Sequence, residues 1–248
     1  MNPVAFHLGS RPVYWYGILM ALAFTSAMTH WYFVGKKEDR PKGFWSDMAF
    51  WIMVGGIIGA RIGYILGNLG YFIENPLSVF RIDEGGLVFY GGLIGCVLVV
   101  IVLAMRQREP VWSMADFAVA PLPLGHAFGR VGCFLNGCCY GSETACAVGV
   151  EMQGAVRHPV QLYEAILNFI LYFLLLVVYR RKRRDGEVLM AYCLIYPLLR
   201  FLIEFMRGDD RWRMLNLTSA QLVSLALLVC GILLWKLLPK KLFRSGKR

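Results

Sequence analysis

Long apolar segments separated by short polar ones make up most of the chain. Each apolar segment is long enough to cross the roughly 30 Å hydrocarbon core of a bilayer as an α-helix, which rises about 1.5 Å per residue. We therefore predict an all-α, polytopic membrane protein with seven transmembrane helices in a single integral membrane domain, residues 1–248. The predicted spans are residues 14–34, 44–66, 86–105, 113–135, 158–179, 188–206 and 217–238.

Two of these spans have distinctive features. The first, 14–34, is longer than the apolar region of a signal peptide and no small-residue cleavage site follows it, so we expect it to be retained. The fourth, 113–135, contains two prolines in "APLPLGHAFGR", and proline interrupts helical hydrogen bonding. This pattern predicts a broken helix that lines a polar cavity.

Composition and charge support the membrane assignment. Of the 248 residues, 58% are hydrophobic and 17% are charged, whereas a soluble domain usually has about 25% charged residues. The net charge of +10 does not indicate nucleic acid, because lysine and arginine gather on one side of the predicted membrane, in the loops 35–43, 106–112 and 180–187 and at the C-terminal end. The positive-inside rule places the N-terminus outside and the C-terminus in the cytoplasm. The basic residues at the C-terminal end are Lys236, Lys240, Lys241, Arg244, Lys247 and Arg248.

Arginine also occurs inside the predicted spans, at Arg61, Arg130 and Arg200. A charged side chain at membrane depth costs several kcal/mol unless it is paired, hydrated or near an interface, so these residues are functional candidates. Arg200, Glu204 and Arg207 follow one helical face at spacings of four and three residues. Glu204 can hold both arginines as a structural ion-pair ladder, or the excess positive charge can bind an anion.

Arg130 has no acidic residue within four positions, so its partner must come from another helix; Glu164 and Glu204 are the candidates. Gly129 and Gly132 beside it allow close approach of another backbone or of a ligand. Because the guanidinium fork matches two oxygens of a phosphate, this arginine is suited to a lipid headgroup.

Arg61 lies in "GGIIGARIGYIL", where glycines at 55, 56, 59 and 63 recur at helical spacing. This spacing favours tight helix packing. The arginine still needs a partner, and Asp47 is too distant on the same helix. In "HPVQLYE" at 158–164, Gln161 and Glu164 share one helical face. His158 either titrates as a base or caps the helix, and capping is the favoured interpretation.

Six blocks occur in order along the chain: "WYG" at 15–17, "ARIGY" at 60–64, "LVFYGGLIG" at 87–95, "GRVGCFLNGCCYG" at 129–141, "HPVQLYE" at 158–164 and "RFLIEFMR" at 200–207. Together they resemble the prolipoprotein diacylglyceryl transferase family. The family signature G-R-x-G-x-F-x-N-G-x-x-x-G is matched by Gly129, Arg130, Gly132, Phe134, Asn136, Gly137 and Gly141.

The resemblance implies the first step of bacterial lipoprotein maturation, in which the diacylglyceryl group of phosphatidylglycerol passes to the lipobox cysteine thiol of a prolipoprotein and glycerol 1-phosphate is released. It implies a multi-pass protein of the bacterial cytoplasmic (inner) membrane with its site toward the outer leaflet. The implied partners are phosphatidylglycerol, prolipoprotein signal peptides and the lipid bilayer, with no cofactor, no metal and no nucleic acid.

The same resemblance implies roles for individual residues. Arg130 and Arg200 are the candidates for a phosphate clamp, because guanidinium groups stabilise the charge that develops as the headgroup leaves. Tyr90 is the third catalytic candidate. The substrate-binding candidates are Tyr16, Arg61, Gly91, Gly92, Asn136, Gly141, His158, Gln161, Glu164, Glu204 and Arg207.

The sequence departs from the family pattern at three positions. Tyr90 stands where most members have histidine, Cys133 where asparagine is common and Cys138 where glutamate is common. A phenol is a poor base at neutral pH unless neighbouring arginines activate it, although it can donate a hydrogen bond to phosphate. The alternative function is therefore a non-catalytic or altered-specificity lipid-binding paralogue. An anion or lipid transporter is a third possibility, but the inverted repeats of many transporters are not visible.

Four of the seven cysteines, Cys133, Cys138, Cys139 and Cys146, cluster in one region. Their spacing matches no common zinc pattern. The last three fall on the predicted outer side, where a disulfide from Cys138 or Cys139 to Cys146 can persist. The other interpretation is that all four are free and packed as small side chains.

Overall fold

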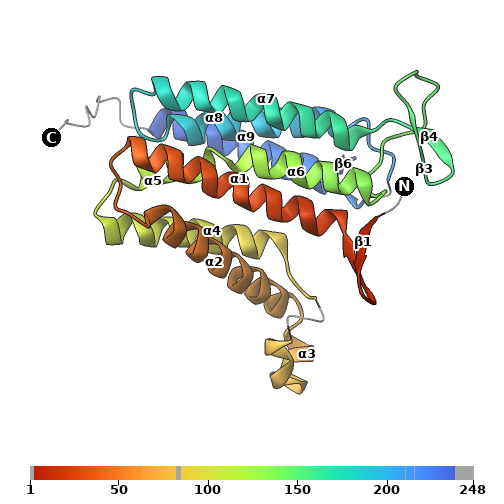
Figure 1. Cartoon of the computed structure of the whole chain (residues 1–248), viewed down its shortest axis with the longest axis horizontal. Helices are drawn as coiled ribbons and strands as arrows, with labels where there is room; N and C mark the ends of the chain where they lie inside the picture. The colour runs from red at the N-terminus through yellow and green to blue at the C-terminus, as the bar shows by residue number, and fades with distance from the viewer. Residues whose placement is uncertain (1–2, 82–84, 210, 215, 238–248) are drawn as a thin grey trace. The chain divides into compact units, whose positions relative to one another are not determined.

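A computed structural model describes residues 3–81, 85–209, 211–214 and 216–237 of the chain. Most of these residues are helical (Figure 1). They divide into two compact units, one made of Met1–His30 with Asp116–Arg248 and the other of Trp31–Ala115. Five of the C-terminal basic residues lie outside the described residues: Lys240, Lys241, Arg244, Lys247 and Arg248.

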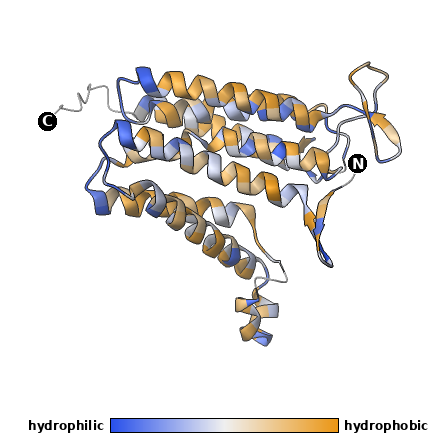
Figure 2. Cartoon of the chain, viewed as in Figure 1, coloured by the Kyte–Doolittle hydropathy of each residue, from blue (hydrophilic) through white to orange (hydrophobic). Residues whose placement is uncertain are grey.

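Five helices in the described part of the chain are long and apolar enough to cross a membrane. They are α1 (Trp15–Lys37), α2 (Phe44–Gly67), α4 (Phe89–Gln107), α7 (Val160–Arg181) and α9 (Ser219–Leu237). Each begins and ends within one helical turn of a predicted span. Large apolar side chains on α7, such as Ile166, Ile170 and Phe173, are more than half exposed, and Figure 2 shows apolar residues all along these helices. Such exposure suits lipid rather than water, as expected of a multi-pass membrane protein.

The other two predicted spans are less regular. The fourth divides at Ala120 and Pro121 into α5 (Val111–Val119) and α6 (Leu122–Leu135), which confirms the predicted break. Proline lacks the N–H that would continue the helical hydrogen bonds. The helix α8 (Glu187–Glu204) matches the sixth predicted span and contains Pro197. Its charged residues exclude it from the candidate spans, so the number of seven spans stays a prediction.

The all-α prediction is incomplete, because the structure also contains three small antiparallel hairpins. β1 (Val4–Leu8) pairs with β2 (Arg11–Tyr14), β3 (Val150–Met152) with β4 (Ala155–Arg157), and β5 (Arg213–Met214) with β6 (Leu217–Thr218). The strands β3 to β6 have only two or three residues each, too few for an alternating pattern to be recognised in the sequence. The short helix α3 (Leu69–Glu74) and the 3-10 turn η1 (Pro76–Phe80) also lie outside the predicted spans.

In the unit Trp31–Ala115, α2 and α4 pack with their backbones in close contact. A Cβ atom added to Gly59 would collide with the carbonyl oxygen of Gly91, and one added to Gly95 would collide with that of Gly55. Only glycine permits this approach. The predicted tight packing of the glycine-spaced helix is therefore confirmed.

In the unit that contains Asp116–Arg248, the helices α6, α7, α8 and α9 run side by side (Figure 1). A fully buried carboxylate, Asp116, fixes the start of α8. Its Oδ1 accepts hydrogen bonds from the backbone N–H groups of Val188 and Leu189, both at 3.0 Å, and its Oδ2 accepts from the N–H of Gly186 at 2.9 Å and from Lys182 Nζ at 3.2 Å. A negative charge at a helix N-terminus also complements the helix dipole. An apolar core packs beside it: Val119, Ala120, Leu171, Leu175, Val188, Tyr192 and Cys193.

Candidate active site

Glu164 lies between two of the arginines that the sequence places inside predicted spans. Its Oε2 is 2.8 Å from Nε of Arg130, and its Oε1 is 3.1 Å from Nη1 of Arg200. The three side chains come from α7, α6 and α8, so three helices meet at one carboxylate. Glu164 and Arg200 are buried, whereas the side chain of Arg130 is 22% exposed. The structure thus brings Arg130 and Arg200 together and gives Arg130 one of its two expected partners.

Glu204 extends this cluster at the end of α8. Its Oε2 is 2.8 Å from Nη1 of Arg200, four residues earlier, and its Oε1 is 3.4 Å from Nη1 of Arg211. The prediction that Glu204 also holds Arg207 is wrong. The helix ends at Glu204, so Arg207 lies beyond it and no longer follows the helical face.

Arg207 pairs with Asp209 instead, through two parallel contacts. Its Nε and Nη2 donate to Oδ1 and Oδ2 of Asp209 at 2.8 and 2.7 Å, and Arg211 reaches Oδ2 at 3.3 Å. Partial burial acts to raise the pKa of Asp209, but the hydrogen bonds from Arg207 and the charge of Arg211 outweigh it and lower the pKa to about 2. Asp209 is therefore ionised at neutral pH.

The cluster carries more positive than negative charge. Among the described residues, four guanidinium groups are linked through ion pairs to three carboxylates. One positive charge is therefore in excess, as an anion site requires. The arginines are Arg130, Arg200, Arg207 and Arg211, and the acids are Glu164, Glu204 and Asp209.

Gly141 marks a crossing of three backbone segments beside this cluster. Its N–H donates to the carbonyl of His158 at 3.0 Å, and it forms an isolated β-bridge with Arg207. A Cβ atom on Gly141 would lie 2.5 Å from that carbonyl oxygen, so only glycine fits. The loop after α6, the start of α7 and the segment after α8 are thereby joined at one point.

Gln161 also holds this loop. Its side chain is buried, and its Nε2 donates to the carbonyl oxygen of Cys138 at 2.7 Å. The favoured prediction that His158 caps α7 is wrong, because the helix begins at Val160 without a side-chain cap. The His158 ring lies instead 3.3 Å from the Tyr163 hydroxyl. Contact of Gln161 or His158 with substrate stays a prediction.

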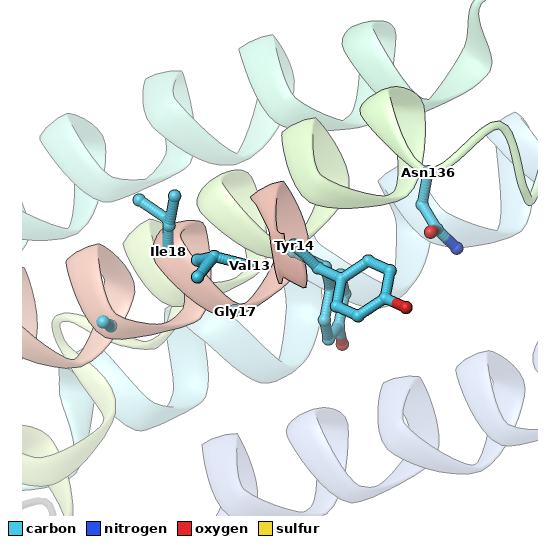
Figure 3. A pocket seen from close by; sticks show the side chains of 7 residues that line it. Val13, Tyr14, Gly17, Ile18 and Asn136 are labelled. Carbon is cyan, nitrogen blue, oxygen red and sulfur yellow. The ribbon is translucent and has the colours of Figure 1, made fainter. Parts of the chain in front are cut away.

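A mainly apolar cavity of about 640 Å³ lies between the start of α1 and the end of α6 (Figure 3). The ring of Tyr16 also packs against α6, where a Cβ atom on Gly132 would lie 3.0 Å from it. Asn136, which lines the cavity, follows the helix that carries Arg130, so the cavity lies near the end of that helix. It offers an apolar surface. Its lining residues are Val13, Tyr14, Tyr16, Gly17, Ile18, Ala21 and Asn136.

Tyr90, Gly91 and Gly92 belong to the other unit, Trp31–Ala115. Tyr90 is in the first turn of α4 and is 48% exposed. The two glycines face α2, since a Cβ atom on Gly92 would lie 3.1 Å from the carbonyl oxygen of Gly56. Helix packing accounts for Gly91 and Gly92, and their contact with substrate stays a prediction.

Arg61 is buried in the same unit, and among the described residues its guanidinium group donates to backbone carbonyls. These carbonyls follow α2 in the sequence, so the guanidinium holds the connection between α2 and α4 in place. They belong to Val79 (Nε, 3.0 Å), Gly85 and Gly86 (Nη1, 2.9 and 3.2 Å) and Ser78 (Nη2). Among the described residues, these hydrogen bonds engage Nε and both terminal nitrogens of Arg61, and a substrate role for Arg61 stays a prediction.

All seven cysteines are within the described residues and are free, so the structure contains no bridge to Cys146. Cys146 is exposed. The sulfur atoms of Cys133, Cys138 and Cys139 instead lie within 4.8 Å of one another, although the sequence spacing predicted no metal site.

Two members of the arginine cluster, Asp209 and Arg211, are absent from the residues predicted from the sequence. The signal for them is the stretch "RGDDR" directly after the sixth predicted span, where acidic residues stand between two arginines. Helical spacing cannot pair these residues, because the helix has already ended.

Comparison with known proteins gives a consistent result over the whole chain. Residues 3–237 match the family model described as prolipoprotein diacylglyceryl transferase. Proteins named phosphatidylglycerol–prolipoprotein diacylglyceryl transferase are similar to it: that of Idiomarina loihiensis is 36% identical over 98% of this chain and 95% of its own length. Those of Campylobacter curvus and Clostridium tetani are 34% and 33% identical, each over 96% of this chain and over 94% and 98% of their own lengths. The chain therefore belongs to the prolipoprotein diacylglyceryl transferase family.

Proposed function

We propose that this protein transfers the diacylglyceryl group of phosphatidylglycerol to the lipobox cysteine thiol of prolipoproteins. The family match and the names of relatives that align over nearly their full lengths support this reaction. The observation that carries the proposal in the structure is the cluster around Glu164, where Arg130 and Arg200 meet with one positive charge in excess.

The chemistry of the reaction requires such a cluster. The thiolate of the lipobox cysteine attacks a glycerol carbon, a C–S bond forms, and the C–O bond to the phosphate breaks, so that glycerol 1-phosphate leaves with the bonding electron pair. Negative charge therefore grows on phosphate oxygens. Preorganised guanidinium groups in a site of low dielectric constant stabilise this charge more in the transition state than in the bound lipid.

Arg130 is the side chain best placed to receive the phosphate. Among the described residues its ion pair with Glu164 is made through Nε, which leaves both terminal nitrogens for a ligand, and it is more exposed than Arg200. Glu164 acts as a positioning residue, because one carboxylate fixes both guanidinium groups. Asn136 and Tyr16 line the neighbouring apolar cavity, which is suited to the hydrocarbon part of a substrate.

Tyr90 is the candidate for the general base. Tyr90 stands where most family members have histidine, and it is exposed enough to meet a substrate. As part of the proposal, its phenol either accepts the thiol proton, activated by arginine, or donates a hydrogen bond to the phosphate.

The finer topology belongs to the proposal as well. It comprises a single membrane domain with seven spans in the bacterial inner membrane, the N-terminus outside and the site toward the outer leaflet, where the cysteine of a signal peptide emerges. Five apolar helices support the membrane location. The basic loops between spans support the orientation.

Transfer of labelled diacylglyceryl from phosphatidylglycerol to a lipobox peptide, in membranes that contain the protein, tests the function. Arg130→Ala should lower kcat roughly 100- to 1000-fold, the usual cost of one electrostatic stabiliser. Lys36→Ala, at an exposed position in the last turn of α1, is the control and should leave the rate unchanged. Equal rates for the two variants would refute the assignment of Arg130 to the phosphate.

The same assay distinguishes the transferase from the second candidate function, a lipid-binding paralogue. Tyr90 and Cys138, which depart from the family pattern, favour that second function. That function predicts binding of phosphatidylglycerol without transfer by the unmodified protein. If transfer occurs, Tyr90→Phe tests the phenol, and we expect a rate at least tenfold lower. Unimpaired turnover would exclude Tyr90 from any essential proton transfer.

A further inference from the structure

Three thiols converge at the end of α6. Cys133 is in the last turn of the helix, and Cys138 and Cys139 are in the loop that follows. The chain turns back over the helix end through two residues with left-handed backbone, Gly137 (φ 70°) and Cys139 (φ 66°). The N–H of Cys138 donates to the carbonyl oxygen of Cys133 at 3.2 Å. A left-handed conformation is unfavourable for cysteine, so this loop holds its thiols in place at an energetic cost.

The distances between the three sulfur atoms suit the coordination of one metal ion. All three Sγ atoms lie within 4.8 Å of one another. Thiolates bound to one Zn²⁺ ion at about 2.3 Å have their sulfur atoms roughly 4 Å apart. We propose that Cys133, Cys138 and Cys139 form a three-thiolate site for a thiophilic cation of the Zn²⁺ class.

The surroundings provide the remaining requirements of such a site. Three thiolates around Zn²⁺ leave one negative charge. Positive charge is close at hand, because the backbone of Arg207 pairs with that of Gly141, two residues after Cys139. The three cysteines are partly exposed, so water can reach the fourth coordination position. On binding, each thiol loses its proton to solvent and three Zn–S bonds form, with no change of oxidation state.

This site borders the candidate active site, because the loop that carries Cys138 and Cys139 also carries Asn136, but it can be tested independently of the transfer reaction. None of its three ligands is a candidate for binding the phosphate, and metal binding can be measured without a lipid substrate. The ion would fix the loop that follows α6, including Asn136 and Gly137.

The test uses the full-length protein, purified in detergent and kept reduced under argon, with Co²⁺ as the spectroscopic substitute for Zn²⁺. We expect one ion per chain, thiolate-to-metal charge-transfer absorption and the release of three protons. Zn²⁺ should displace Co²⁺ and protect Cys133, Cys138 and Cys139 from alkylation, as read by mass spectrometry. Cys139→Ser should lower the affinity by more than the roughly 10- to 100-fold that loss of an outer-shell partner costs.

Cys146→Ser is the matched control, since this exposed thiol lies in the same region but outside the cluster, and it should bind as the unmodified protein does. Because Cys139→Ser changes a residue in a constrained loop, Cys138→Ser provides a second ligand variant, and protection from alkylation needs no variant at all. Absence of thiolate-to-metal absorption, an equal loss of affinity in the Cys146 variant, or a disulfide among the three cysteines that persists after treatment with a reductant would overturn the proposal.

Discussion

Glu164→Gln removes the charge that Arg130 and Arg200 share and changes the shape of the side chain very little. In the structure Glu164 is 3% exposed, and its two oxygens are 2.8 and 3.1 Å from the two guanidinium groups. Removal of one partner from a buried ion pair costs about 3–5 kcal/mol, because the remaining charge stays buried. The variant should therefore unfold at a temperature roughly 6–20 °C lower, at about 2–4 °C per kcal/mol for a chain of this size.

Glu143→Gln is the matched control for this prediction. Glu143 also pairs with an arginine, with Oε1 2.9 Å from Nη2 of Arg157, but its side chain is 69% exposed. An exposed ion pair contributes about 0–1 kcal/mol, which corresponds to a shift of at most about 4 °C. Both variants would be compared by thermal unfolding in the same detergent.

An added anion gives a second readout. The substitution of Glu164 raises the excess of the cluster from one positive charge to two, so glycerol phosphate should stabilise this variant more than it stabilises the unmodified protein. Unfolding temperatures that agree within about 2 °C for the Glu164 and Glu143 variants, with no difference in the response to the anion, would show that the shared carboxylate does not hold the arginines.

Two further predictions concern packing and pH. Gly59→Ala should destabilise the protein by about 1–3 kcal/mol, because the added methyl group meets a backbone carbonyl of α4; Gly67→Ala, where nothing lies within 4 Å, should have little effect or a slightly stabilising one, and thermal unfolding compares the two. Asp209 has a folded-state pKa of about 2, below its ordinary value of about 3.9. Its contribution to stability is therefore complete above about pH 4 and is lost as the pH falls toward 2. Urea unfolding in micelles from pH 2 to 5 should show this loss in the unmodified protein and not in Asp209→Asn; equal slopes in the two proteins would contradict the ion pair with Arg207.

The helices could be predicted well because their signal is local. The apolar run 14–34 becomes α1, and the prolines of the fourth span break it at Pro121, since both effects depend on neighbours in the sequence. The hairpins could not be predicted in this way. Strands such as Arg213–Met214 are two residues long and depend on backbone pairing rather than on a hydrophobic pattern.

The arginine cluster was predictable only in part. Arg130 and Glu164 stand out as charges in apolar surroundings, and the absence of nearby acids indicated that their pairing must cross between helices. The partner of Arg207 depended instead on where α8 ends, which helical spacing alone does not reveal. Arg61 shows another limit, because its guanidinium group donates to backbone carbonyls of a loop, and carbonyls have no signature in the sequence.

The carboxylate shared by three helices has a consequence for biogenesis. Arg130, on α6, and Glu164, on α7, are 34 residues apart in the chain. The arginine is therefore synthesised before the carboxylate that neutralises its charge. An unpaired arginine on a helix that enters the bilayer alone costs about 2.5–3.5 kcal/mol on the translocon scale. We therefore expect α6 to remain at the translocon until α7 emerges from the ribosome, and the two helices to enter the lipid as a pair.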